Sequence, residues 1–235
     1  YDKMLNNREI DIVLILAPNT QHAPLALKAI NKGKHVLIEK PIATNHKDAL
    51  KIKLAAAENG VKVMCTQHQR FRPPSFVCKK AIEHNKIGNI YYVKARAVEV
   101  RHLPFHSDSF IKKRLSGGGC LLDIGVHILD VAWWMMGSPE PKSLSGQCFS
   151  KLSSQSPIIR QLLGDRAFEG EESAFAFIKF KNGSVMSLDT SYLLNDKERD
   201  FGFIAYGDKA GLSWPSVHVI QEKNSKMVEV ELQNK

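Results

Sequence analysis

The first third of the chain alternates short apolar runs with amphipathic stretches, and this alternation most constrains the fold. Apolar runs at Ile10–Leu16, His35–Ile38 and Val61–Cys65 have the length and β-branched content of strands buried on both faces. Between them, Ala23–Ile30 and Lys47–Asn59 carry apolar residues at helical spacing, and a glycine follows each stretch. A β-α-β-α-β order with short loops predicts a parallel, doubly wound sheet.

From about residue 90 the pattern changes to strand-like alternation. The dipeptide Asn182-Gly183 stands between two alternating runs and predicts a β-hairpin. We expect strands at 91–100, 174–180, 185–190, 200–206, 217–221 and 227–232, and a loop at 150–157. The chain therefore divides into residues 1–68, a partial parallel α/β domain, and residues 69–235, an α+β domain with a mainly antiparallel, open sheet.

The charge of the chain is basic but dispersed. The 235 residues carry a formal net charge of +9. Lysines are scattered through the expected helices and loops, and the one local cluster, Lys112-Lys113-Arg114, is short and lacks interleaved aromatic residues. We therefore expect no nucleic-acid partner. We also see no apolar run of membrane-spanning length and no signal-peptide pattern, and expect no membrane partner.

The cysteines are widely spaced and form no CxxC pair, which favours reduced thiols in a cytoplasmic protein. They are Cys65, Cys78, Cys120 and Cys148. His102 and His106 have a metal-ligand spacing for a helix, but Pro104 between them would break that helix. We expect no metal site.

Polar residues gather where the predicted parallel strands end. Pro18-Asn19, Glu39-Lys40-Pro41 and Thr66-Gln67-His68 each follow one of these strands. In open parallel sheets, ligands bind beyond the carboxyl ends of the strands. These three segments are therefore candidates for a ligand site.

A glycine triplet, Gly117-Gly118-Gly119, precedes an apolar segment that contains Asp123 and His127. Residues four apart share one face of a helix, so the acid and the imidazole would point together. Such a pair suits proton transfer, although a buried helix whose histidine satisfies a hydrogen bond has the same pattern. No Gly-Lys-Ser/Thr follows the triplet, so it is no phosphate loop; we expect it to let the backbone approach closely where ligands meet.

Lys40 lies at a strand end between an acid and a proline. A surface charge is the usual interpretation of a single lysine. Its strand-end position, the adjacent Glu39 and the turn imposed by Pro41 argue instead for a functional group. A lysine there could hydrogen-bond both a cofactor and a substrate hydroxyl, and its charge could lower the pKa of a neighbour.

Three motifs in register resemble the glucose–fructose oxidoreductase, inositol dehydrogenase and MocA family along nearly the whole chain. They are Ala17-Pro18-Asn19 with His22, the run Gly33–Pro41, and Gly117-Gly118-Gly119 with Asp123, His127 and Asp130. The turns at Asn182-Gly183 and at 206–211 match later landmarks of that family.

The resemblance implies an NAD- or NADP-dependent oxidoreductase that acts on a sugar, a polyol or a related hydroxy compound. It implies that His127 accepts the hydroxyl proton, that Lys40 stabilises the alkoxide, and that Asp123 orients a substrate hydroxyl or supports His127. It also implies homo-oligomerisation through the open C-terminal sheet. The implied cofactor-binding residues are Pro18, Asn19, His22, Glu39, Lys40 and Pro41. The implied substrate-binding residues are Lys40, Arg101, Asp123 and His127, with Phe110 as a weaker candidate.

The sequence departs from the family at its start. It contains no Gly-x-Gly-x-x-Gly turn and no acidic residue after a second strand, the elements that bind the pyrophosphate and choose between NAD and NADP. The first strand resembles the fourth of a six-stranded domain. We therefore expect an N-terminally truncated member with the C-terminal half of a Rossmann domain.

Two other functions are compatible with the same fold. One is a glycosidase that uses bound NAD transiently, and the other is a ligand-sensing relative without catalysis. A sensor could dispense with the catalytic groups, whereas Lys40, Asp123 and His127 are all present. Their presence favours the dehydrogenase.

Overall fold

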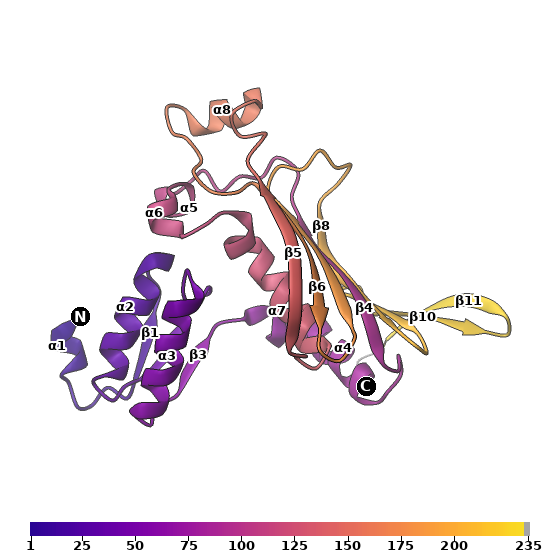
Figure 1. Cartoon of the computed structure of the whole chain (residues 1–235), viewed down its shortest axis with the longest axis horizontal. Coiled ribbons are helices and arrows are strands. Elements are labelled where there is room, and N and C mark those ends of the chain that lie inside the picture. Colours follow the sequence, from indigo (N-terminus) through magenta and orange to yellow (C-terminus); the bar gives the residue numbers. More distant parts are fainter. Residues whose placement is uncertain (233–235) are drawn as a thin grey trace.

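The computed structural model describes residues 1–232, which form two units, each built on its own sheet (Figure 1). In the N-terminal unit, strands β1 (Ile12–Ile15), β2 (His35–Ile38) and β3 (Val63–Cys65) form a parallel sheet in that order. The helices are α1 (Asp2–Leu5), α2 (Asn19–Ile30) and α3 (His46–Glu58). The predicted β-α-β-α-β order is confirmed.

The parallel strands are covered on one face only. Helices α2 and α3 bury one side of the sheet, where Val13, Ile15 and Ile38 are enclosed. On the opposite side Ile12 and Leu14 are 64% and 53% exposed. The prediction of strands buried on both faces is therefore wrong for the described residues, because both connecting helices pack on the same side.

A 3-10 turn, η1 (His68–Phe71), and helix α4 (Pro73–Glu83) lead into an eight-stranded sheet of order β11-β10-β9-β8-β4-β7-β6-β5. Its strands are β4 (Ile90–Val98), β5 (Pro141–Phe149), β6 (Ser173–Phe180), β7 (Val185–Ser191), β8 (Asp200–Gly207), β9 (Gly211–Trp214), β10 (His218–Lys223) and β11 (Lys226–Glu231). Every neighbouring pair is antiparallel except β4 with β7. The predicted α+β domain with a mainly antiparallel sheet is confirmed, including the β6–β7 hairpin.

Sequence analysis did not identify β5 and β9. All residues of β5 are exposed, because it is the edge strand, so its sequence carries no alternation to recognise. Strand β9 has only four residues. Both strands pair through backbone hydrogen bonds that no side-chain pattern reports.

Five helical segments complete the second unit: α5 (Asp108–Ile111), α6 (Lys113–Ser116), the π-helix η2 (Leu121–Gly125), α7 (Val126–Met135) and α8 (Pro157–Leu163). Helix α7 packs on one face of the large sheet and buries Ile128, Val131 and Ala132 in its core. In Figure 1 it lies between the two units, which places its N-terminal end near the carboxyl ends of the parallel strands.

One helical run, Lys113–Met135, is 23 residues long and apolar enough to cross a membrane by length and composition alone. This finding contradicts the expectation that no apolar run reaches this length, although Gly117, at φ 79°, separates α6 from the π-helix within the stretch. In the fold its C-terminal part, α7, is a core helix of the second unit.

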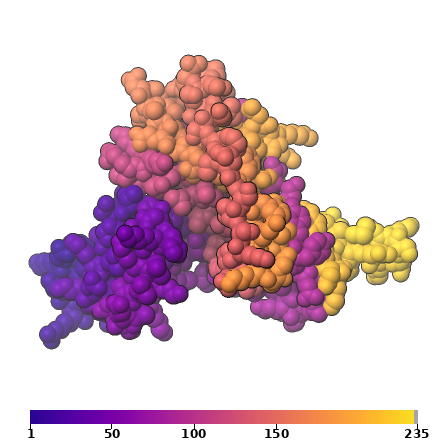
Figure 2. Space-filling model, in the orientation of Figure 1, coloured from indigo at the N-terminus to yellow at the C-terminus, as the bar shows by residue number. Residues whose placement is uncertain are grey.

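The space-filling view shows the N-terminal unit beside the body of the molecule and the β10–β11 hairpin extending away from that body (Figure 2).

Candidate functional site

Lys40 and Asp123 come from different units and form an ion pair. Lys40 follows β2 closely and leads into a cis peptide bond with Pro41. Its Nζ donates to Asp123 Oδ1 at 2.7 Å and to the Asp123 backbone oxygen at 2.9 Å. The two side chains are only 14% and 19% exposed, so the pair is weakly screened by solvent. The structure thus brings together two of the predicted catalytic residues.

Asp123 lies in the π-helix that precedes α7. π-helical turns are rare and occur frequently at functional sites. The hydroxyl of Tyr192 donates to Asp123 Oδ2 at 2.7 Å, so each carboxylate oxygen has its own donor. The carboxylate thus binds Lys40 and Tyr192, while its negative charge acts to raise the pKa of His127; its predicted role toward His127 or a substrate hydroxyl stays a prediction.

Glu171 anchors the start of this helical segment. Its carboxylate accepts hydrogen bonds from the backbone N–H groups of Gly119 at 2.8 Å and Leu121 at 3.0 Å. A Cβ on Gly119 would lie 2.0 Å from the Glu171 backbone oxygen, and one on Gly117 would lie 2.3 Å from Cγ2 of Thr44. A close approach of the backbone is therefore present, and the neighbours that require it are Glu171 and Thr44.

The His127 imidazole is largely enclosed. Its Nδ1 is buried and has no hydrogen-bond partner within residues 1–232. The ring packs edge-on against His68, with centroids 4.7 Å apart. Burial, followed by the positive charge of Lys40 and the influence of His68, lowers the pKa of His127 to about 3. The imidazole is therefore neutral near pH 7 and has a lone pair available for a proton.

A cavity of about 280 Å³ lies beyond the carboxyl ends of β1 and β2. Pro18, Asn19, Glu39 and Lys40 line it, as predicted for cofactor contacts, and Ser109 and Phe110 form the opposite side. The lining residues are Leu16, Ala17, Pro18, Asn19, Glu39, Lys40, Ser109 and Phe110. This is where parallel α/β sheets bind their ligands.

The polar residues around this cavity are already oriented. The Asn19 Nδ2 donates to the Ser116 backbone oxygen at 2.9 Å, which joins the two units. The Glu39 carboxylate accepts from Thr66 Oγ1 at 2.5 Å. The cavity and the Glu39 carboxylate fit the nicotinamide–ribose end of a dinucleotide, since a carboxylate can accept hydrogen bonds from ribose hydroxyls.

Two other predicted cofactor residues lie behind the cavity. His22 is fully buried, with Nδ1 at 2.6 Å from the Pro41 oxygen and Nε2 at 2.8 Å from the Ala17 oxygen. Carbonyl oxygens only accept, so the ring N–H donates to one of these two oxygens, and the tautomer decides which. His22 and Pro41 thus act on the cavity through the backbone that they hold.

Arg101 does not join the Lys40–Asp123 pair. Its guanidinium donates to the backbone oxygen of Leu193 at 2.7 Å and contacts Asn195. It therefore fastens the segment that follows Tyr192. Its predicted role in substrate binding has no direct contact to support it, because the donors face this segment.

Sequence analysis missed Tyr192 and Glu171 as functional residues. Both contacts span a long stretch of chain, so no local spacing reveals them. The position of His68 at a strand end was the one available signal for its place beside His127.

A salt bridge also joins η1 to α7, where Arg70 binds Asp130 through two hydrogen bonds of 2.7 and 2.6 Å.

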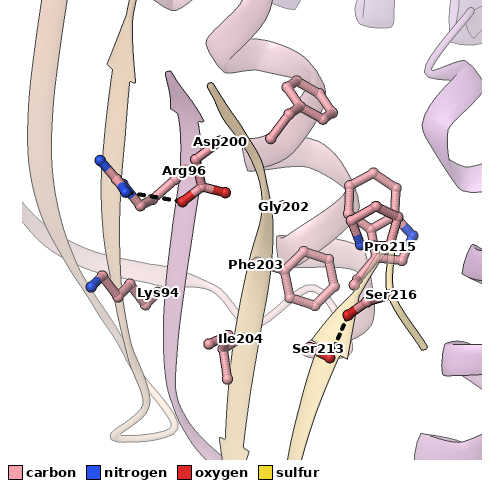
Figure 3. A pocket seen from close by; sticks show the side chains of 11 residues that line it. Lys94, Arg96, Asp200, Gly202, Phe203, Ile204, Ser213, Pro215 and Ser216 are labelled. Carbon is pink, nitrogen blue, oxygen red and sulfur yellow. Dashed lines mark hydrogen bonds and ion pairs between the residues drawn. The ribbon is translucent and has the colours of Figure 1, made fainter. Parts of the chain in front are cut away.

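A second cavity, of about 320 Å³, lies on the large sheet and is lined by residues of β4, β8 and β9. Figure 3 shows Arg96 and Asp200 facing each other at one side of it and Ser213 hydrogen-bonded to Ser216 at the other. Arg96 is also paired with Asp189 and Asp196, and the hydrogen bond to Asp196 raises the pKa of the guanidinium. Three carboxylates therefore more than balance the charge of this cation, and its guanidinium is not free to bind an anion.

Family models match both units of the chain. Residues 1–67 match the model described as an oxidoreductase family with an NAD-binding Rossmann fold. Residues 77–213 match the model of the GFO/IDH/MocA C-terminal domain. The N-terminal unit is therefore part of an NAD-binding Rossmann domain, in agreement with its parallel sheet.

Among curated proteins, the D-glucoside 3-dehydrogenase of Escherichia coli (strain K12) is 32% identical over 220 residues, which are 93% of this chain and 62% of that protein. The 1,5-anhydro-D-fructose reductase of Ensifer adhaerens is 25% identical over 90% of this chain and 59% of its own length. The chain thus spans about three fifths of the length of these relatives.

Among solved structures, levoglucosan dehydrogenase in complex with NADH and levoglucosan superposes with a TM-score of 0.81 at 21% identity, covering 97% of this chain and 62% of that one. An inositol dehydrogenase homolog with NAD+ from Azotobacter vinelandii gives 0.80 at 19% identity, covering 98% and 59%. These likenesses support the fold. Together with the two domain matches, they show that the chain belongs to the GFO/IDH/MocA oxidoreductase family.

Proposed function

We propose that the protein is an NAD- or NADP-dependent oxidoreductase that interconverts a hydroxyl and a carbonyl group of a sugar or polyol. The observation that carries this proposal is the Lys40–Asp123 ion pair beside a neutral His127, at the carboxyl ends of the parallel strands. The names of the relatives, which include a glucoside and a levoglucosan dehydrogenase, support a sugar as substrate.

A bound nicotinamide ring supplies the hydride acceptor or donor for such a reaction. Pro18, Asn19 and Glu39 would hold its ribose end, because they line the cavity. Lys40 Nζ donates a hydrogen bond to the substrate oxygen and stabilises negative charge that develops there. In the direction of oxidation, the hydroxyl proton moves to His127 Nε2, and in reduction it returns from that nitrogen.

The division of roles follows from the contacts of Asp123. Its two oxygens already accept from Lys40 and Tyr192, so the carboxylate holds the ammonium in place and leaves proton transfer to the imidazole. The Arg101 guanidinium already donates to the Leu193 oxygen and to Asn195, so we do not assign it to the reacting oxygen. We therefore place Lys40 and His127 against the reacting oxygen and Asp123 behind Lys40.

The test uses the full-length protein with NAD or NADP and a panel of sugars and polyols, while the absorbance of reduced nicotinamide is followed. We expect turnover with at least one sugar. Hydrolysis of a glycoside without net cofactor reduction would support an NAD-dependent glycosidase instead. Tight cofactor and sugar binding without any turnover would support a ligand sensor, and either result would contradict the proposal.

We also propose that the protein self-associates through the open face of its large sheet. This face, opposite α7, carries the stacked rings of Tyr92 and Tyr206 and the side chain of Phe177, which is 41% exposed. Apolar and aromatic side chains on an exposed sheet face are typical of protein interfaces. On the same face, the Arg96 guanidinium is paired with Asp189, Asp196 and Asp200.

Light scattering on full-length protein tests self-association. We expect the native protein to have at least the mass of a dimer and Phe177→Glu to lower it. Leu54→Glu, an equally drastic change of an exposed residue on α3, serves as the control and should leave the mass unchanged. A native protein of monomer mass would contradict the proposal.

A reducing compartment such as the cytoplasm is the proposed location. All of the cysteines have free thiols, and burial raises the pKa of Cys78 to about 12 and, with a contribution from Glu39, that of Cys65 to about 11. Thiols of this kind are unreactive. Fractionation of cells that express the native protein tests this location, and recovery from the culture medium would contradict it.

A further inference from the structure

We propose that Tyr192 is a positioning residue that holds the Asp123 carboxylate turned toward Lys40. The proposal rests on the proposed oxidoreductase function for its effect on turnover. Its structural basis is that the Tyr192 hydroxyl and the Lys40 ammonium bind opposite oxygens of one carboxylate, each at 2.7 Å. Neither donor could be moved without leaving an oxygen of a nearly enclosed carboxylate unpaired.

Tyr192 itself is held from three directions. Its ring packs edge-on against Phe168, with centroids 6.0 Å apart. Its backbone N–H donates to the Glu172 oxygen at 2.9 Å, and its backbone oxygen accepts from the N–H of His102 at 3.0 Å. The residue is 2% exposed. These contacts fix the orientation of the Tyr192 side chain. Its hydroxyl can therefore fix the orientation of the Asp123 carboxylate.

Glu172 connects this residue to the other support of the π-helix. Glu171, the preceding residue, binds the N–H groups of Gly119 and Leu121 at the start of the same helical segment. Glu172 is itself 2% exposed and accepts hydrogen bonds from three consecutive backbone N–H groups, beginning with Lys151. The segment that positions Asp123 through Tyr192 is therefore the one that anchors the backbone around Asp123.

The phenol acts only as a donor. Burial first, and then the negative charge of Asp123, raise the pKa of Tyr192, so its hydroxyl stays protonated throughout the working pH range. It is also absent from the lining of the Lys40 cavity. Tyr192 therefore acts on the reaction through Asp123 and Lys40 and does not exchange a proton with the substrate.

The first test compares Tyr192→Phe with the native full-length enzyme. Phe keeps the buried ring and removes only the hydroxyl, and circular dichroism checks the fold. Once its second oxygen loses its donor, the carboxylate is free to rotate and Lys40 is less well placed for the alkoxide. We expect kcat to fall about tenfold while KM changes by less than about twofold. Tyr91→Phe is the control, since Tyr91 is 57% exposed and no hydrogen bond of its hydroxyl is seen within residues 1–232.

A double-mutant cycle shows whether the effect passes through Asp123. In an Asp123→Asn background, Tyr192→Phe should have little further effect, because the two residues act as one unit. A purely structural role of Tyr192 would instead lower kcat in both backgrounds by the same factor. Equal, multiplicative losses would therefore overturn the proposal.

A measurement without cofactor or substrate separates this proposal from the proposed function. Mass spectrometry would follow the modification of Lys40 by an amine-reactive reagent. Lys40 should react about tenfold faster in Tyr192→Phe and in Asp123→Asn than in the native protein. The double variant should react no faster than either single variant. Unchanged reactivity of Lys40 in Tyr192→Phe would overturn the positioning role. A protein without turnover on any sugar would refute the function and leave this result interpretable.

Discussion

The two walls of the site are held in different ways. The N-terminal wall, residues 17–19 and 39–41, is supported from nearby in the chain, since His22 binds oxygens 5 and 19 residues away. The C-terminal wall, residues 119–127, is supported by Glu171 and Tyr192, whose contacts to Leu121 and Asp123 span 50 and 69 residues. The N-terminal wall is therefore supported by contacts within a short stretch of chain. The C-terminal wall is supported by contacts between distant segments of the second unit.

This difference indicates which residues of the site take their positions through local contacts. A strand, its turn and the following helix place Lys40 with few long-range contacts. The Asp123–His127 wall needs the glycine triplet to meet a segment that begins after α8. We therefore expect substitutions in the two walls to differ in their balance of lost activity and lost stability.

The largest expected effect is on activity and concerns one residue of each wall. Lys40→Met and His127→Gln should each lower kcat by about 10²–10⁴-fold, because one removes the charge at the reacting oxygen and the other removes the proton acceptor. Steady-state kinetics of the full-length enzyme measure this. Lys53→Met, which changes an exposed lysine on α3, is the control. Native-like turnover in either variant would remove that residue from the mechanism.

Gly119→Ala tests the rigidity of the C-terminal wall. The new Cβ would lie 2.0 Å from a backbone oxygen, so the backbone must shift, and we expect a loss of about 3 kcal/mol in the free energy of unfolding. Gly118→Ala is the matched control, because its Cβ would meet the flexible end of Leu122 at 3.0 Å. Denaturant melts compare them. Equal stability of both variants would show that this wall adapts easily.

His22→Ala tests the local support of the N-terminal wall. It removes the ring N–H that donates to the Pro41 or the Ala17 oxygen and leaves a cavity in the core, and we expect a loss of about 2 kcal/mol in stability. Thermal melts measure it, with the exposed His46→Ala as control. If His22→Ala matched His46→Ala, the turn at Lys40 would be held by other contacts and the comparison between the walls would weaken.

The last expected effect is a slope rather than a single loss, namely the pH dependence that His127 contributes to stability. Its pKa is about 3 in the folded protein and 6.5 in the ordinary imidazole. Between these values the unfolded chain binds a proton that the folded protein does not, so stability falls as the pH is lowered through this window, by at most about 1.4 kcal/mol per pH unit. His127→Gln should flatten that slope and the exposed His84→Gln should not. Identical slopes would contradict a buried neutral His127.

Local patterns predicted the N-terminal unit and its contribution to the site well. The end of β2 marked Lys40 because parallel strands place their carboxyl ends at one edge, and the i, i+4 spacing marked Asp123 with His127. The π-helix was invisible, since its extra residue per turn leaves the apolar pattern almost unchanged.

What could not be predicted depends on tertiary contact alone. Tyr192 follows a strand like many aromatic residues, and the packing of β7 against the π-helix brings it near Asp123. The guanidinium of Arg101 suggested a substrate contact, yet backbone oxygens after Tyr192 occupy it. The glycine triplet signalled close approach correctly, but no pattern in the sequence identifies the partner of that approach.

The bonds between the units have a consequence for motion. Asn19 to Ser116 and Lys40 to Asp123 both cross from one unit to the other, next to the reacting position. A hinge that opened the cleft would have to break both, including an ion pair that is shielded from water. We therefore expect the two units to move little relative to each other at the edge where Lys40 and Asp123 meet.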